Sequence, residues 1–121
     1  MANQKIMVVD DSRLTRALLA HALTEAGYSV VEAANGDEAL KLFDEHHPAV
    51  VITDFMMPGM DGIELARRLK SKNKKLPIIL ISVEFNKEVK LRSEKIGIKF
   101  YLFKNFEKKD LLKKVKAALE A

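Results

Sequence analysis

The stretch Ala-Val-Val-Ile-Thr-Asp-Phe-Met-Met-Pro-Gly-Met-Asp-Gly, residues 49–62, decides how the rest of the chain is interpreted. It starts with apolar, mostly β-branched residues, which is typical of a strand buried on both faces of a parallel sheet. The run ends on the carboxylate of Asp54, and the Pro-Gly pair that follows indicates a turn. Asp61 and Glu64 have the spacing of a capping box and predict a new helix. An acidic side chain therefore ends a central strand, at the edge where open α/β sheets bind ligands.

Strands and helices are expected to alternate along the whole chain. The hydrophobic pattern predicts strands at residues 5–9, 28–33, 49–54, 77–82 and 99–104. Helices are expected at residues 13–26, 35–46, 62–70, 84–95 and 108–119. The apolar face of the first helix is predicted to consist of Leu14, Ala17, Leu18, Ala22 and Ala26. Five strand-helix units predict one α/β domain over residues 1–121, with helices on both faces of a parallel sheet.

Composition excludes several classes of protein. The 121 residues suffice for one hydrophobic core, and without cysteine there is neither a disulfide framework nor a thiolate metal site. No apolar run has the length of a signal peptide core or a membrane span, so we expect a cytoplasmic protein without membrane insertion. Residues 67–121 carry 17 Lys and Arg against 6 Asp and Glu. Because no helix-turn-helix pattern accompanies this basic half, we expect no direct binding of nucleic acid.

Polar side chains stand where four of the predicted strands end. They are Asp10 and Asp11, Asp54, Ser82 and Lys104. Because the carboxyl ends of parallel strands meet at one edge, we expect these side chains to form one site. Three neighbouring carboxylates need a cation or raised pKa values, and hard oxygen ligands suit Mg²⁺, with Mn²⁺ as the other candidate. A carboxylate nucleophile beside a metal and an ammonium group has the composition required for phosphoryl transfer.

These residues resemble the receiver domain of two-component response regulators. The resemblance rests on Val-Val-Asp-Asp-Ser at residues 8–12, on Asp54 with Met-Pro-Gly-Met-Asp-Gly at 57–62, on Ser82, and on Phe-Lys at 103–104. It covers the whole chain, including Asn-Gly-Asp-Glu-Ala-Leu at residues 35–40. The family implies a flavodoxin-like, doubly wound (βα)5 fold with five parallel strands in the order 2-1-3-4-5.

The resemblance also implies a phosphoacceptor and a metal site. Asp54 would take a phosphoryl group from a sensor histidine kinase or a histidine phosphotransfer protein. Asp11 and Asp54 would bind Mg²⁺ together with the backbone carbonyl of Met56, and Asp10 would reach the metal mainly through water. The domain would not be an enzyme in the usual sense, because it would catalyse only its own phosphorylation and dephosphorylation.

Three further residues take roles from the family. Ser82 and Lys104 would hold the phosphoryl oxygens. Tyr101 corresponds to an aromatic residue whose rotation, coupled to Ser82, remodels the face formed by the fourth helix, fifth strand and fifth helix. Tyr101 also fits an aromatic residue that only packs within a strand, so the sequence leaves both interpretations open.

Two residues depart from the family pattern beside the expected site. Asn105 stands where proline usually follows the lysine, and a cis bond before a residue other than proline costs about 3–4 kcal/mol. A trans peptide is therefore an alternative, with a different placement of Lys104. Val83 stands where alanine or glycine is usual, and its bulk is expected to affect access to the phosphoryl site. Met56 and Glu84 occupy positions that vary within the family and tune dephosphorylation.

We interpret the sequence as a stand-alone receiver domain whose output is binding to a downstream target protein. One possible role is a diffusible signal, as in chemotaxis, and another is a phosphorelay intermediate that passes the phosphoryl group from Asp54 onward to a histidine. A third interpretation is a pseudo-receiver, a docking module without phosphorylation. The intact set of three aspartates, one serine and one lysine argues against this third interpretation.

Overall fold

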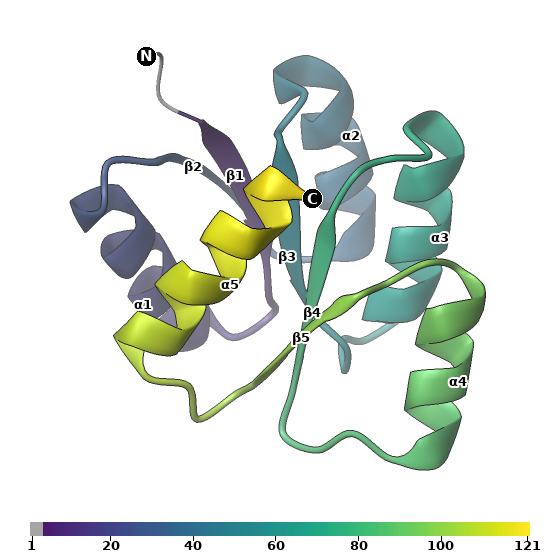
Figure 1. Cartoon of the computed structure of the whole chain (residues 1–121). Coiled ribbons are helices and arrows are strands. Elements are labelled where there is room, and N and C mark those ends of the chain that lie inside the picture. The colour runs from purple at the N-terminus through teal and green to yellow at the C-terminus, as the bar shows by residue number, and fades with distance from the viewer. Residues whose placement is uncertain (1–3) are drawn as a thin grey trace.

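Five strands form one parallel sheet in a computed structural model that describes residues 4–121. They are β1 (Lys5–Val9), β2 (Ser29–Ala33), β3 (Val50–Asp54), β4 (Ile78–Ser82) and β5 (Phe100–Phe103). The strand order is β2-β1-β3-β4-β5, with every neighbouring pair parallel, which confirms the predicted flavodoxin-like order (Figure 1). The first three residues of the predicted domain 1–121 lie outside the described residues.

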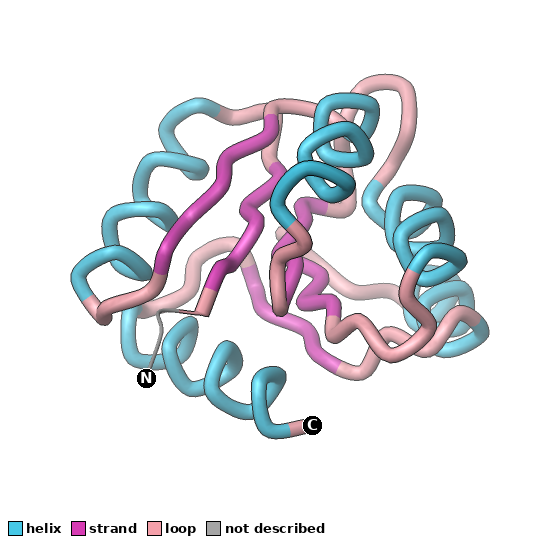
Figure 2. Tube along the Cα trace, turned by 90° about the horizontal axis from the view of Figure 1, so that it is seen from above, coloured by secondary structure: helices cyan, strands magenta, loops and turns pink. Residues whose placement is uncertain are grey.

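Five helices cover the two faces of the sheet. They are α1 (Arg13–Glu25), α2 (Gly36–His46), α3 (Gly62–Lys72), α4 (Lys87–Lys95) and α5 (Lys108–Glu120). Side chains of α1 and α5 pack against one face, and those of α2, α3 and α4 pack against the other. Figure 2 shows the sheet between these two groups of helices. Strand β3 lies at the centre and is buried throughout, which explains its continuous apolar sequence.

The predicted apolar face of α1 is wrong. Leu14 and Leu18 are 72% and 57% exposed, whereas Leu19 and Leu23 are buried against the sheet. Ala22 is the one predicted position of this helix that is buried. Since apolar residues surround much of α1, helical spacing alone does not determine which side faces the core. The side chains of Leu14 and Leu18 therefore lie on the surface of α1.

Helix α4 begins three residues later than predicted. Its first residue is Lys87, and the side chain of Asn86 caps it by accepting a hydrogen bond of 2.9 Å from the backbone N–H of Val89. Glu84 and Phe85 therefore belong to the β4–α4 loop, beside the carboxyl end of the sheet. The other predicted bounds differ from the observed ones by at most two residues.

The start of α3 positions the backbone of Asp54. Asp61 caps the helix by accepting a 2.8 Å hydrogen bond from the N–H of Glu64, but the Glu64 side chain pairs with Arg67 and Arg68 instead of completing a capping box. A Cβ atom at Gly62 would lie 2.2 Å from the carbonyl oxygen of Asp54. Glycine is therefore required here because helix and strand backbones approach so closely.

Candidate functional site

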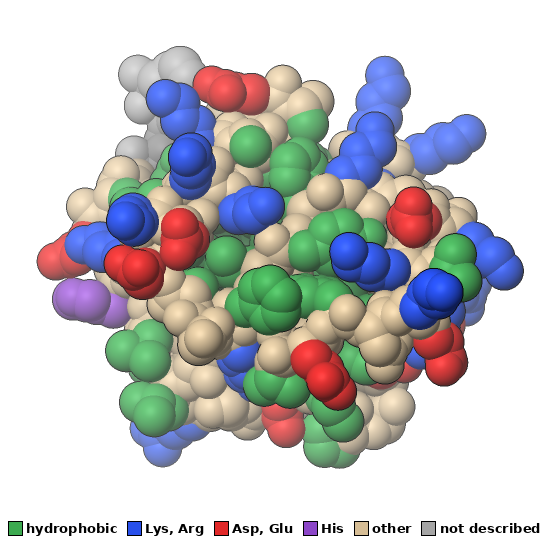
Figure 3. All heavy atoms as spheres, turned by 60° about the horizontal axis from the view of Figure 1, so that its bottom comes forward, with side chains coloured by type: hydrophobic (Ala, Val, Ile, Leu, Met, Phe, Trp, Pro, Cys, Tyr) green, Lys and Arg blue, Asp and Glu red, His purple; other side chains and the backbone are tan. Residues whose placement is uncertain are grey.

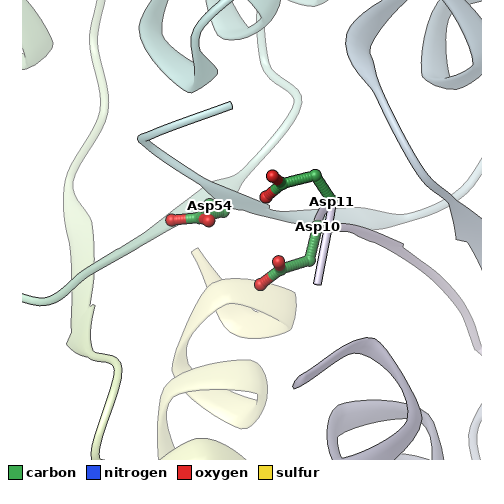
Figure 4. A group of neighbouring side chains, drawn as sticks. All are labelled: Asp10, Asp11 and Asp54. Atoms are coloured by element: carbon green, nitrogen blue, oxygen red, sulfur yellow. The ribbon is translucent and has the colours of Figure 1, made fainter. Parts of the chain in front are cut away.

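Three carboxylates meet at the carboxyl edge of the sheet. Asp10 and Asp11 directly follow β1, and Asp54 is the last residue of β3. One carboxylate oxygen from each lies within 4.8 Å of those of the other two (Figure 4). Asp10 and Asp54 are buried, whereas Asp11 is exposed. The structure thus brings together the acidic residues that the sequence predicted to form one site.

Asp10 combines burial with incomplete hydrogen bonding. The backbone N–H of Ser12 donates to its Oδ1 at 2.8 Å, but Oδ2 is buried without a hydrogen-bond partner among the described residues. Burial raises the pKa of Asp10, and the neighbouring charges of Asp54 and Asp11 raise it further, against lowering contributions from the Ser12 hydrogen bond and Lys104. A buried carboxylate oxygen without a partner is costly unless a cation or proton binds to it.

Lys104 supplies a positive charge directly at this cluster. Its Nζ atom lies 2.9 Å from Oδ2 of Asp54 and 3.6 Å from Oδ2 of Asp10. Burial lowers the pKa of Lys104, but the hydrogen bond and charge of Asp54 outweigh this effect and raise it above the ordinary value. The peptide between Lys104 and Asn105 is trans, which is the alternative that the missing proline left open. The ammonium group still reaches Asp54.

The cluster fits a divalent cation. Three carboxylates lie together with one ammonium group beside them, and Oδ2 of Asp10 accepts no hydrogen bond from residues 4–121. Carboxylate oxygens are the ligands preferred by Mg²⁺, Mn²⁺ and Ca²⁺. Met56 follows Asp54 in the β3–α3 loop with its side chain 66% exposed, and the role of its carbonyl as a metal ligand stays a prediction.

The hydroxyl of Ser82 donates its hydrogen bond to the backbone, whereas the resemblance predicted a phosphoryl oxygen as its acceptor. The Ser82 side chain is buried, and its hydroxyl donates a 2.7 Å hydrogen bond to the backbone carbonyl of Glu84. The neighbouring Val83 is 68% exposed, so its side chain lies on the surface of the loop. In this conformation the hydroxyl is held by the β4–α4 loop.

Tyr101 lies on β5, half-buried beside the same loop. Its hydroxyl donates a 3.0 Å hydrogen bond to the carbonyl of Ile98. The ring of Phe85 packs edge to face against the ring of Tyr101, with centroids 5.4 Å apart, and also against the ring of Phe103 at 5.2 Å. These contacts support packing by Tyr101 in this conformation, and a rotation of its ring would require Phe85 to move.

Two residues at the site were missed by sequence reasoning. Arg16 on α1 donates a 2.7 Å hydrogen bond from Nη1 to the backbone carbonyl of Asp10 and contacts Glu32 of β2 through Nε at 3.2 Å. Arg16 therefore braces the backbone that carries two of the carboxylates. Phe85 was missed because it was expected inside a helix. No sequence pattern marks either contact, since both depend on where a loop or helix lies relative to the sheet.

Comparison with known proteins gives the family. Residues 6–116 match the sequence model of the response regulator receiver domain. The chain belongs to this family. Receiver domains of response regulators act in two-component systems, where they bind a divalent metal at an acidic pocket and interact with kinases and downstream effectors.

Two curated relatives of this receiver domain are longer transcriptional regulators. It is 33% identical over 117 residues to the alkaline phosphatase synthesis transcriptional regulatory protein PhoP of Bacillus subtilis, covering 97% of this chain and 49% of that protein. It is 35% identical to the phosphate regulon transcriptional regulatory protein PhoB of Pseudomonas aeruginosa, covering 98% of this chain and 53% of PhoB. The chain thus spans about half the length of these curated relatives.

A solved structure of similar length has the same fold. The chemotaxis protein CheY4 of Vibrio cholerae superposes with a TM-score of 0.92 at 36% identity, covering 98% of this receiver domain and 100% of CheY4. Among residues 4–121, no helix combines the length and apolar character needed to cross a bilayer.

Proposed function

We propose that Asp54 accepts a phosphoryl group from a phosphohistidine of a sensor histidine kinase or a histidine phosphotransfer protein, with Mg²⁺ held by Asp10, Asp11 and Asp54. The observation that supports this most is the direct pairing of buried Asp54 with Lys104, next to a buried oxygen of Asp10 that accepts no hydrogen bond from the described residues. Such a site combines a nucleophilic carboxylate with charge that stabilises phosphoryl oxygens.

The transfer needs no other acid or base from this chain. An oxygen of Asp54 forms a bond to phosphorus as the phosphorus–nitrogen bond of the donor breaks, and the electron pair leaves with the donor imidazole. Lys104 moves from Asp54 to the new phosphoryl group and donates to its oxygens. The cation, when bound, supplies positive charge to the same oxygens. The domain thus promotes its own phosphorylation and the later hydrolysis of the acyl phosphate.

We propose that a change of hydrogen-bond partner at Ser82 couples phosphorylation of Asp54 to the conformation of the β4–α4 loop. The hydroxyl of Ser82 would leave the carbonyl of Glu84 and donate to a phosphoryl oxygen on Asp54. This exchange would release the β4–α4 loop, and Phe85 in that loop packs on Tyr101. The surface formed by α4, β5 and α5 would then change and bind a downstream target. A cytoplasmic location would follow from partners of this kind and stays a prediction.

Exposed apolar side chains lie close in sequence to the site residues and suit contact with a protein donor. Those within three residues of Asp11, Asp54, Ser82 or Lys104 are Leu14, Met56, Val83 and Phe103, and Leu18 lies one helical turn beyond Leu14; all five are more than half exposed. Figure 3, in which the bottom of Figure 1 comes forward, shows hydrophobic side chains distributed among charged ones over this side of the molecule. We infer that these side chains add apolar contact area where a protein donor approaches Asp54.

Replacing the two exposed leucines of α1 should separate the donor contact from the chemistry. We expect Leu14→Lys combined with Leu18→Lys to slow transfer from the cognate phosphohistidine protein at least about tenfold, since apolar contact area is lost. The rate with acetyl phosphate should stay within about twofold, because that small donor needs no docking surface. Leu91→Lys on α4, 56% exposed, is a control that adds one lysine in place of an exposed leucine outside α1. Equal loss with both donors would contradict the docking role.

The proposed function is tested by intact-protein mass after incubation with acetyl phosphate. We expect a gain of one phosphoryl group with Mg²⁺, none with a chelator, and none in Asp54→Asn. If no gain occurs with any donor, and Mg²⁺ causes no change in melting temperature, the chain is a docking module. Rapid return of the phosphoryl group to a histidine domain would identify a relay intermediate, and one-way loss to water would identify a terminal signal.

A further inference from the structure

A pocket lies at the opposite edge of the sheet from Asp54, where β4 and β5 begin. It has a volume of about 440 Å³ and is formed by the end of α3, the α3–β4 connector and the α4–β5 turn. Figure 1 shows α3 ending at the top of the sheet, where β4 begins, whereas the phosphorylation edge lies at the bottom. A pocket of this size can hold a small organic ligand.

Four lysines line this pocket from three separate segments. Lys70 belongs to α3, Lys74 and Lys75 to the α3–β4 connector, and Lys99 to the residues just before β5. Among residues 4–121, no acidic side chain forms an ion pair with any of the four, whereas nearby Lys72 pairs with Asp44 at 3.1 Å. The pocket therefore concentrates positive charge without internal compensation.

Lys70 is the most buried of these four lysines. It is half-buried, and its Nζ lies near the α4–β5 turn, 3.5 Å from where a Cβ of Gly97 would be. Burial lowers the pKa of Lys70, and the charge of Lys99 lowers it further. A bound anion would relieve this repulsion, because it places negative charge beside the ammonium groups of Lys70 and Lys99.

The remaining lining residues give the pocket an apolar side. Pro77 and Phe100 line it beside the lysines, and Ile78 lies beneath them. Ala121 also lines the pocket. A pocket lined by both lysines and an aromatic ring suits a compact anion with an organic portion better than an extended polyanion.

We propose that this pocket, which we name the lysine pocket (Lys70, Lys74, Lys75 and Lys99), binds a small phosphate ester or polyphosphate with two or more negative charges. The recognising chemistry is ammonium groups on phosphate oxygens, with Phe100 and Pro77 against the organic portion. Since the lysine pocket and Asp54 lie at opposite ends of the sheet, such binding would be a separate input to the receiver domain.

Calorimetric titration with inorganic pyrophosphate and with ADP tests the proposal. The buffer should contain a chelator and physiological salt, so that phosphates cannot bind through a metal at the three aspartates and weak surface attraction is screened. We expect saturable binding of one equivalent to the wild type and to Asp54→Asn. Lys70→Gln combined with Lys99→Gln should weaken binding at least tenfold, and Lys74→Gln with Lys75→Gln provides a second variant confined to an exposed connector.

The matched control is Lys87→Gln combined with Lys109→Gln, which removes the same net charge from exposed sites at the opposite pole. It should change affinity less than twofold. Tighter binding of ADP than of pyrophosphate would support the contact with Phe100, and equal binding would support recognition by phosphate groups alone. No saturable binding, or equal weakening in the control, would overturn the proposal.

Discussion

Asp10→Asn should make the metal-free receiver domain more stable while abolishing its response to Mg²⁺. In the wild type, Oδ2 of Asp10 is buried beside the like charges of Asp54 and Asp11; it accepts no hydrogen bond within residues 4–121, and the ammonium group of Lys104 lies 3.6 Å away. The amide oxygen of asparagine can keep the hydrogen bond from Ser12, and its NH₂ group can donate toward the remaining carboxylates. Removing one buried, unsatisfied charged group is worth about 1–3 kcal/mol.

The measurement is the melting temperature of both proteins with a chelator and with Mg²⁺. We expect Asp10→Asn to melt about 4 °C higher for each kcal/mol gained when no metal is present. Added Mg²⁺ should raise the melting temperature of the wild type, because ligand binding to the native state stabilises it, and leave the variant unchanged. Asp11→Asn is the control, since Asp11 is exposed and should give a smaller gain in stability.

The stabilisation by Asp10→Asn should depend on pH with a defined sign. Because the folded protein raises the pKa of Asp10, the native state binds this proton more tightly than the unfolded chain does. The contribution of Asp10 to wild-type stability is therefore complete at acid pH and is lost as the pH rises through the raised pKa. The difference between variant and wild type should grow over that interval and then level off. A difference that is constant from acid to neutral pH would contradict the buried-charge explanation.

The sheet and its acidic edge were predictable because each strand carries its own signal. Apolar runs that end in Asp10, Asp54 or Ser82 indicate both a buried strand and the edge at which it stops. Parallel pairing then brings residues that are distant in sequence to one place, without further information. The three carboxylates and Lys104 accordingly meet as predicted.

What could not be predicted depends on the orientation of surfaces and on local competition for hydrogen bonds. Leu14 and Leu18 are exposed because α1 turns a different side to the sheet, and its apolar residues occupy too many positions to reveal that side. The end of the β4–α4 loop depends on the cap formed by Asn86. The hydroxyl of Ser82 has several acceptors within reach of its strand end, and only the folded loop selects the carbonyl of Glu84.

Contacts that the sequence did not predict connect helix α4 to the loop that follows Asp54. Nη2 of Arg92 lies 3.2 Å from Oδ2 of Asp61, and its guanidinium lies 5.9 Å from the ring centre of Phe55, the residue after Asp54. Asp61 in turn caps α3, whose first residue, Gly62, contacts the backbone of Asp54. A shift of α4 would therefore disturb the β3–α3 loop, so the proposed change in the output surface and the state of Asp54 are mechanically connected.

Lys104→Met should slow phosphorylation by acetyl phosphate about a hundredfold or more at saturating Mg²⁺. Methionine keeps most of the side-chain volume but removes the ammonium group that lies 2.9 Å from Asp54. A positioned donor that stabilises developing charge in the transition state contributes about 10²–10³ in rate. The measurement is the initial rate of mass gain as a function of acetyl phosphate concentration, with Lys104→Arg as the variant that keeps the charge and alters its geometry.

Mg²⁺ affinity distinguishes this role from a merely structural one. In the wild type, the ammonium group of Lys104 contacts carboxylates of both Asp54 and Asp10 and competes with the metal for their charge. Lys104→Met should therefore bind Mg²⁺ at least as tightly as the wild type while reacting far more slowly. Loss of both properties together would mean that the variant has disordered the acidic cluster, and an unchanged rate would mean that Lys104 does not contact the phosphoryl group. Slow chemistry with intact metal binding would place Lys104 on the phosphoryl oxygens, which its present contact with Asp54 prepares it to reach.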